Sequence, residues 1–162
     1  MADGLSDEEK ARKDLLWGMY TDLRTHARHA ETLRSSVVNF MIVVASVLIA
    51  VIANDGHVAG NELALCLVIV VVGALGLAFA ASYTELYERN RSRAVRVRTT
   101  LDDMFFAGGE TMTSLLRAAD QQHEVGVLYR WSRRLTGSTR RFWFVLPSLV
   151  LVAGLALTVL AL

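Results

Sequence analysis

Charged residues are missing from three long stretches of this chain, and their absence sets the first limit on what the protein is. Residues 37–53, 63–82 and 142–162 contain no Asp, Glu, Lys or Arg. About 20 apolar residues in a helix cross the core of a bilayer, so we expect three transmembrane spans, the first at the short end of the range. Ion-coupled transporters usually keep an ionisable group at mid-membrane. A coupled pump is therefore disfavoured, whereas a passive pore lined by weakly polar residues stays open.

Cysteine and proline are also scarce, and the familiar catalytic motifs are absent. The single cysteine, Cys66, lies in an apolar run, which excludes a disulfide framework or a zinc site within one chain. The single proline, Pro147, falls in the second turn of the third span, where we expect a modest kink. Gly108 and Gly109 lack the strand and the lysine that a phosphate-binding loop needs. We therefore expect no enzyme activity and no cofactor.

Two histidines near the N-terminus are candidate metal ligands. His26 and His29 are three residues apart, and a metal ion would need further ligands such as His123. A packed or solvated pair of histidines is the simpler interpretation. We therefore predict no metal site.

Positive charge is distributed unevenly along the chain. Of the 17 Lys and Arg residues, 6 lie in residues 1–36 and 11 in residues 83–141. The connection at residues 54–62 has none, and carries only Asp55 and Glu62. The positive-inside rule then predicts a membrane protein with a cytosolic N-terminus, a cytosolic middle segment and an external C-terminus. The N-terminal segment does not read as a signal peptide, because its apolar run begins only at Val37 and continues as a span.

Two heptad seams predict helices that continue from the spans into the cytosol. Both have residues recurring at spacings of three and four, which is the pattern of a packed helix pair. One seam follows the second span and comprises Tyr83, Tyr87, Asn90, Ala94, Val97, Leu101 and Met104; the other precedes the first span and comprises Leu16, Met19, Leu23, His26, Ala30, Leu33 and Val37. Ser6 and Glu9 have capping-box spacing at the start of the N-terminal helix. We expect the two seams to pair antiparallel.

The rest of the middle segment is expected to return to the membrane. Gly108 and Gly109 end the second helix, and residues 110–135 have helical composition. The outgoing and returning helices would rise about 36 and 39 Å, so their lengths agree. The predicted fold is all-α, a polytopic membrane protein whose three transmembrane helices are continuous with a cytosolic three-helix antiparallel bundle. Its segments are a cytosolic helix at 7–36, spans at 37–53, 63–82 and 142–162, an external loop at 54–62, and cytosolic helices at 83–106 and 110–135.

Small residues and one asparagine are candidates for packing or oligomer contacts. Gly73, Gly76 and Ala80 in the second span let helix backbones approach closely, against the first span, the third span or another subunit. Asn90 lies on the seam among apolar neighbours, where a buried Asn fixes register or assembly state, or it simply reaches solvent.

Two further sets of residues flank the third span. Arg140, Arg141 and Trp143 have the composition of a membrane-interface anchor. Before them, an apolar stripe is rotated relative to that of residues 112–119, and we interpret it as a kink or as a face for a partner or the bilayer surface. This stripe consists of Val127, Leu128, Trp131 and Leu135.

The arginine-rich run at residues 89–98 and a small group of acids allow several interpretations. Acidic lipid headgroups, a nucleotide-like signal and nucleic acid are candidate ligands of the run, and a solvated basic face is the simplest interpretation. Nucleic acid is disfavoured because aromatic residues are not interleaved with the arginines. The adjacent Asp102 and Asp103 diverge on a helix and make a poor acid–base pair, so a solvated helix end is expected there.

The layout resembles that of small bacterial SLATT-type membrane effectors of antiphage and nucleotide-signalling systems. The likeness covers about residues 15–104 and includes the stretches at 20–26 (YTDLRTH) and 83–89 (YTELYER). The third span departs from the two-span plan of that family. Such effectors are thought to oligomerise and permeabilise the inner membrane when a partner triggers them, so the resemblance implies a homo-oligomer with a cytosolic protein trigger.

These observations favour a non-enzymatic oligomeric effector that forms a pore or perturbs the membrane. The alternative is a structural or adaptor membrane protein whose cytosolic helical stalk docks a partner protein. A membrane enzyme acting through Asp102, Asp103, Glu110 and His123 is the third and least favoured class.

Overall fold

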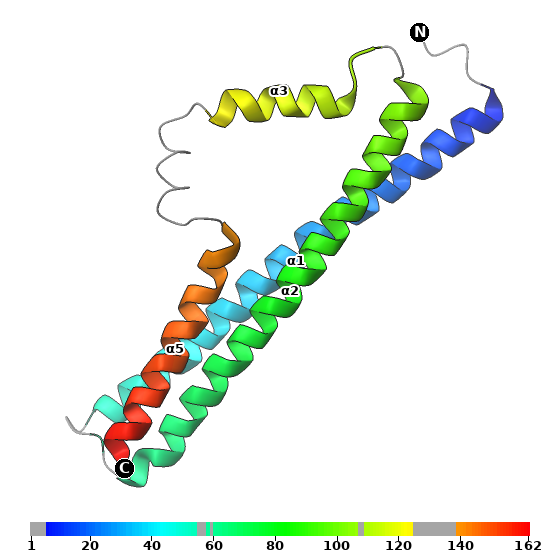
Figure 1. Ribbon diagram of the computed structural model, residues 1–162. Helices are drawn as coiled ribbons and strands as arrows, with labels where there is room; N and C mark the ends of the chain where they lie inside the picture. The colour runs from blue at the N-terminus through cyan, green and yellow to red at the C-terminus, as the bar shows by residue number, and fades with distance from the viewer. Residues whose placement is uncertain (1–5, 55–57, 59, 107–108, 125–138) are drawn as a thin grey trace. The chain divides into compact units, whose positions relative to one another are not determined.

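Helices make up nearly all of the part of the chain that the structure describes. The computed structural model describes residues 6–54, 58, 60–106, 109–124 and 139–162, and no strand occurs among them. The elements in chain order are α1 (Asp7–Ala53), the 3₁₀ helix η1 (Gly60–Glu62), α2 (Leu63–Phe105), α3 (Met112–Glu124) and α5 (Thr139–Ala161) (Figure 1). The prediction of an all-α protein is confirmed.

Three of these helices are long and apolar enough to cross a membrane. They are α1, the combined segment Gly60–Phe105, and Trp143–Ala161 of α5. The predicted spans at 37–53 and 63–82 lie within the first two, and the predicted span at 142–162 extends one residue beyond the third at each end. Pro147 lies inside α5 and does not end it. Pro147 is the ninth residue of α5, beyond the first turn, so its ring nitrogen cannot donate the hydrogen bond that other interior helix residues make to the carbonyl four residues earlier.

Both long helices run without a break from a polar segment into an apolar one. α1 has 47 residues and α2 has 43. α2 remains helical through residues 78–92, where the apolar pattern gives way to the seam that begins at Tyr83. Neither Gly nor Pro occurs between Gly76 and Gly108, so nothing in that stretch weakens the helix.

The chain divides into two compact units. We call Met1–His29 with Leu86–Leu135 the polar unit, and Ala30–Glu85 with Thr136–Leu162 the apolar unit. α1 and α2 each contribute a segment to both. The predicted spans fall in the apolar unit.

The core of the apolar unit joins α1, α2 and α5. Ile52, Cys66 and Ile69 are buried together, and Val150 and Leu157 of α5 pack against them. Further along, Arg34 of α1 bonds to Thr84 of α2. Ile52 of α1 lies beside Cys66 and Ile69 near the start of α2, whereas the earlier Arg34 lies beside the later Thr84. α1 and α2 therefore run antiparallel here.

Glycines bring α2 and α5 close together in the same unit. A Cβ atom added to Gly73 would lie 2.6 Å from the Leu151 backbone, and one added to Gly154 would lie 2.8 Å from the backbone nitrogen of Val70. Only glycine fits at such distances, because real Cβ atoms do not approach a backbone so closely. Close backbone approach through small residues is a common basis of helix packing in membranes.

The core of the polar unit is narrow and built largely from alanine. Ala27 and Ala94 are buried, as is Leu101. The α2 seam is buried or partly buried from Tyr83 to Leu101, and its last member, Met104, is 37% exposed. The predicted α1 seam is wrong at two positions. Met19 is 47% exposed, and the His26 side chain is 62% exposed and lies 3.4 Å from Asp22.

The third helix begins at Met112 and makes little contact along its length. Every side chain from Ser114 to Gln121 is exposed, including Leu115 and Leu116. Residues 125–138, which hold the predicted partner face, lie outside the described part of the chain. The three-helix bundle therefore stays a prediction.

Candidate functional site

A buried arginine lies at the start of the apolar unit. Arg34 of α1 is only 5% exposed. Its Nη1 donates a hydrogen bond of 3.1 Å to the Thr84 hydroxyl of α2, and Nη2 lies 3.8 Å from the Glu31 carboxylate. The guanidinium carbon lies 4.6 Å from the centre of the Trp143 ring of α5. One side chain thus contacts all three long helices of the apolar unit.

These contacts compensate the cost of burying a charge. An ionised group away from water requires hydrogen bonds and an opposite charge or a π face. Thr84 supplies the oxygen and Trp143 the ring, which attracts a guanidinium by a cation–π interaction. Glu31 is half exposed and contributes a weaker attraction. Ionisable groups at the edge of spans are expensive, and they are therefore candidates for function.

Sequence reasoning missed this cluster, although a signal was present. Arg34 follows Ala30 by four residues and precedes Val38 by four, and all three are buried. The signal is a charged residue four positions from an apolar residue on either side, just before an uncharged span and one position away from the predicted seam residue Leu33. Trp143 was predicted as a headgroup anchor, and its ring lies against Arg34. Arg140 and Arg141 belong to the first turn of α5, and their side chains lie outside the described part.

A second buried charge anchors the start of α3. Asp102 of α2 is 4% exposed. Its carboxylate accepts hydrogen bonds from the Met112 amide at 2.9 Å, from the Thr113 amide at 3.0 Å and from the Thr113 hydroxyl. The first amides of a helix lack partners within the helix, so a carboxylate there acts as a cap and interacts favourably with the helix dipole.

Opposing effects act on the pKa of Asp102. Burial raises it, whereas the hydrogen bonds from Thr113 and Met112 and the positive charge of Arg98 lower it. The lowering effects together prevail, so the pKa of Asp102 is below its ordinary value. The expectation of a solvated helix end is wrong for Asp102. It holds for Asp103, which is exposed.

Among the described side chains, no other candidate catalytic or metal-binding residue contacts Asp102. Glu110 is exposed, and the side chain of His123 lies outside the described part. No group of three His, Cys, Asp or Glu residues suited to a metal ion occurs among the described residues. The hydrogen bonds of Asp102 therefore assign it to holding α3.

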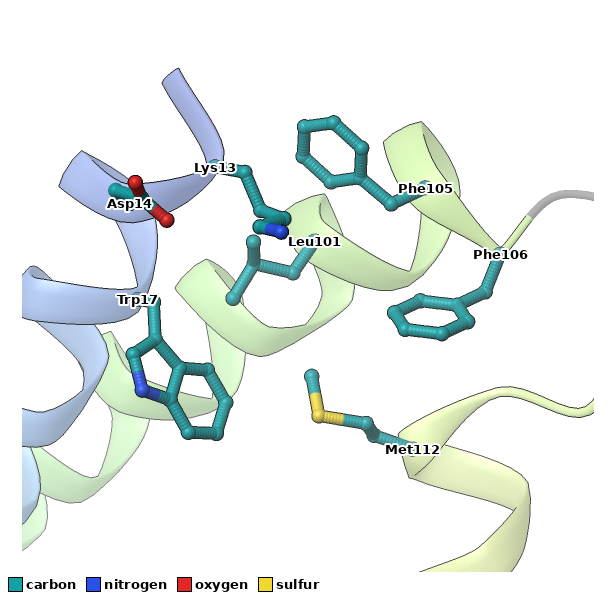
Figure 2. A pocket seen from close by; sticks show the side chains of 7 residues that line it. All are labelled: Lys13, Asp14, Trp17, Leu101, Phe105, Phe106 and Met112. Atoms are coloured by element: carbon teal, nitrogen blue, oxygen red, sulfur yellow. The ribbon is translucent and has the colours of Figure 1, made fainter. Parts of the chain in front are cut away.

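An aromatic groove lies beside this anchor in the polar unit. Its volume is about 380 Å³. Leu101 of α2 lies at its centre, among Trp17 of α1, Phe105 of α2, Phe106 directly after α2, and Met112 of α3 (Figure 2). The further lining residues are Lys13 and Asp14. Because Met112 is held by Asp102 through its amide, the anchor also fixes one wall of the groove. We call this set of residues the aromatic groove.

A second groove in the polar unit has a basic edge. It has a volume of about 440 Å³ and combines the apolar side chains Met19, Leu23 and Val97 with Asp22, Arg93 and Arg96. Within the described residues Arg93 and Arg96 form no ion pair. Two unpaired arginines one helical turn apart favour an anion, whereas Asp22 opposes one.

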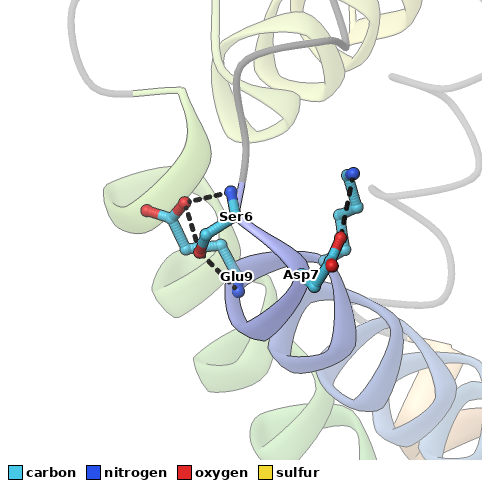
Figure 3. Close-up of polar contacts among 4 residues, drawn as sticks. Ser6, Asp7 and Glu9 are labelled. Atoms are coloured by element: carbon cyan, nitrogen blue, oxygen red, sulfur yellow. Dashed lines mark hydrogen bonds and ion pairs between the residues drawn. The ribbon is translucent and has the colours of Figure 1, made fainter.

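The start of α1 has the predicted capping box. The Ser6 amide and hydroxyl donate to the Glu9 carboxylate at 2.8 and 2.9 Å, and the Glu9 amide donates to the Ser6 hydroxyl oxygen at 3.2 Å (Figure 3). These bonds from the Ser6 backbone and side chain lower the pKa of Glu9. The predicted start of the N-terminal helix is confirmed.

The predicted packing residues fall in different places. Gly73 and Gly76 both face α5. A Cβ atom added to Gly76 would lie 3.1 Å from the Pro147 side chain and 3.2 Å from the Met41 sulfur. Ala80 is fully buried in the apolar unit and Asn90 is buried in the polar unit. The glycines therefore serve contacts within this chain. Whether Ala80 and Asn90 also contribute to an oligomer stays a prediction.

Comparison with protein-family models, curated proteins and solved structures finds no match to this chain.

Proposed function

We propose that this protein is a non-enzymatic membrane effector that, as a homo-oligomer, forms a pore in the bilayer or perturbs it. In this proposal the protein lies in the bacterial inner or plasma membrane. The distribution of Lys and Arg supports a cytosolic polar unit and N-terminus and an external C-terminus. An antiphage role follows from the SLATT-type layout and is part of the same proposal.

The observation that carries the proposal is the continuity of α1 and α2. Each is one helix from the polar unit into the apolar unit. A helix without a break transmits a shift or a rotation at one end to the other, as in known switching transitions. A trigger bound to the polar unit would therefore act on the spans directly.

The outer face of α1 in the apolar unit supports an assembled pore. Asn39 and Ser46 are seven residues apart, so they share one face of the helix, and both are exposed. Val43, between these two residues, and Ala50, four residues after Ser46, lie on the same face and are also exposed. In a closed ring of copies, this stripe provides the weakly polar lining that a passive pore needs.

Release of a trapped dye from liposomes tests the proposal. Purified protein is reconstituted at increasing density, and release is compared with empty liposomes. We expect release that rises steeply with protein density. The variants Asn39→Leu and Ser46→Leu should slow it, whereas Val47→Leu, on a neighbouring exposed position, should not. Vesicles that stay tight in every oligomeric state would overturn the proposal.

The alternative is an adaptor whose polar unit docks a partner protein. Its support is the exposed pair Leu115 and Leu116 on α3, since large apolar side chains in contact with water often mark interaction sites. Residues Val127 and Trp131 belong to the same proposal through their sequence pattern. Pull-down with Leu116→Glu, Val127→Glu and Trp131→Glu variants separates the two functions. An adaptor loses its partner in these variants, whereas a pore keeps its dye release.

A further inference from the structure

The aromatic groove has the features of a small-molecule site. Its volume of about 380 Å³ lies in the range of ligand pockets, and its lining is dominated by apolar and aromatic side chains. Trp17 and Phe106 are 49% and 42% exposed, so their rings are accessible from outside. Leu101, at the bottom, is buried and gives the groove a fixed floor.

One positive charge is directed at this apolar surface. Figure 2 shows the Lys13 side chain extended towards Leu101, with its ammonium group on the inner side of the groove, and Asp14 on the adjoining part of α1 at the edge. Within the described residues Lys13 forms no ion pair. An ammonium group without a counter-ion beside three aromatic rings complements a ligand with an apolar body and an acidic end.

We propose that the aromatic groove binds a small aromatic or aliphatic acid, with its apolar body among Trp17, Phe105 and Phe106 and its carboxylate at Lys13. Met112 forms the wall contributed by α3, and the hydrogen bond from its backbone amide to the Asp102 carboxylate keeps that wall in place. The binding site is therefore complete only when α3 is anchored. That the bound acid triggers the effector rests on the proposed function, whereas the binding of the acid does not.

Binding of 2-naphthoate to the full chain in lipid nanodiscs tests the proposal, with empty nanodiscs subtracted. Titration calorimetry gives the Kd of 2-naphthoate, of the uncharged 2-naphthalenemethanol and of the cationic 2-naphthylmethylamine. We expect the acid to bind with a Kd of about 1 mM or lower, and more tightly than either analogue. Stronger binding of the amine would assign the charge selection to Asp14 and overturn the proposal, as would the absence of acid binding.

Matched variants locate the site. Lys13→Gln should weaken acid binding up to about fivefold and leave the alcohol unchanged, whereas Arg12→Gln, on the neighbouring exposed position, should change neither. Phe106→Ala should weaken both ligands about tenfold, and Leu116→Ala, outside the groove, should not. Equal binding in all four variants would mean that the ligand sits elsewhere and would overturn the assignment.

Dye release separates this inference from the proposed function. If the acid binds in the groove and liposomes remain tight, the site stands and the pore is contradicted. If liposomes leak but the acid does not bind, the pore stands and the site is contradicted.

Discussion

The guanidinium of Arg34 lies 4.6 Å from the centre of the Trp143 ring, and this contact links α1 to α5. The same guanidinium donates to Thr84 of α2. Three helices from distant parts of the sequence thus meet at one charged group. Removing one partner leaves that charge buried with fewer contacts, which costs more than the pair contributes when intact.

Loss of either partner should destabilise the apolar unit. Thr84→Val keeps the shape and removes the acceptor, and we expect a loss of about 1.5–3 kcal/mol, as for hydrogen bonds to charged groups. Trp143→Leu should cost at least about 2 kcal/mol, since a desolvated cation–π contact is lost together with packing. Thermal unfolding in nanodiscs measures both, and Trp143→Phe, which keeps a ring, should lie between Trp143→Leu and the wild type. Wild-type stability of Thr84→Val would contradict the role assigned to the hydrogen bond.

The anchor of α3 should depend on the Asp102 carboxylate. Asp102→Ala removes the carboxylate that accepts hydrogen bonds from two backbone amides and one hydroxyl group. We therefore expect a loss of about 1–3 kcal/mol of local stability. Hydrogen exchange resolves this loss, because amides at the start of α3 should exchange about 5- to 100-fold faster while those of α1 are unaffected. Asp103→Ala, on the exposed neighbour, is the control. Equal exchange in both variants would remove the basis for the anchor.

Acid should release the same anchor. The pKa of Asp102 is lower in the folded chain than its ordinary value, so the folded state favours the ionised carboxylate. The stabilisation is complete above the ordinary pKa of an aspartate, about 3.9, and is lost as the pH falls through the lowered folded value. Exchange of the first α3 amides should therefore accelerate below about pH 4, after correction for the intrinsic rate. The Asp102→Asn variant should show no such acceleration.

Two glycines in helices should respond oppositely to alanine. At Gly73 a new Cβ would meet the Leu151 backbone at 2.6 Å, so Gly73→Ala should separate α2 from α5 and cost about 1–3 kcal/mol. At Gly18 nothing lies within 4 Å, so Gly18→Ala should stabilise α1 by up to about 1 kcal/mol. Unfolding midpoints in detergent compare the two. A loss at Gly18 would indicate a neighbour there, such as a second copy.

Cysteine labelling tests the proposed orientation. In a Cys66→Ala background, a cysteine introduced by Arg91→Cys should react with a membrane-impermeant maleimide only after the inner membrane is opened. A cysteine introduced by Asn54→Cys should react in intact spheroplasts. The reverse pattern would contradict the orientation that the arginines predict.

The helices and spans could be predicted because their signals are local. Uncharged runs, heptad spacing and the Ser6–Glu9 spacing each depend on neighbours within one or two turns. What could not be predicted depends on contacts between distant segments. By its charge alone, Arg34 is indistinguishable from the other basic residues predicted to be cytosolic, and its contacts with Thr84 and Trp143 in the structure set it apart.

The seams illustrate the same limit. Both His26 and Ala27 fit a spacing of three and four, and only the close approach of the partner helix selects the smaller side chain. Asp102 and Asp103 differ by one position on α2, and their burial differs because the start of α3 covers only one of them. The aromatic groove combines residues from three helices, so spacing along any one helix does not reveal it.

The unbroken course of α1 constrains how this chain can evolve. Each residue added to a helix rotates all later residues by about 100° around the helix axis. A single insertion near residue 29 would therefore turn the face that carries Asn39 and Ser46 by that angle relative to residues 7–28. Seven added residues would nearly restore the present orientation of that face and lengthen the helix by about 10 Å. Natural length variants of this stretch should therefore differ by three, four or seven residues rather than by one or two.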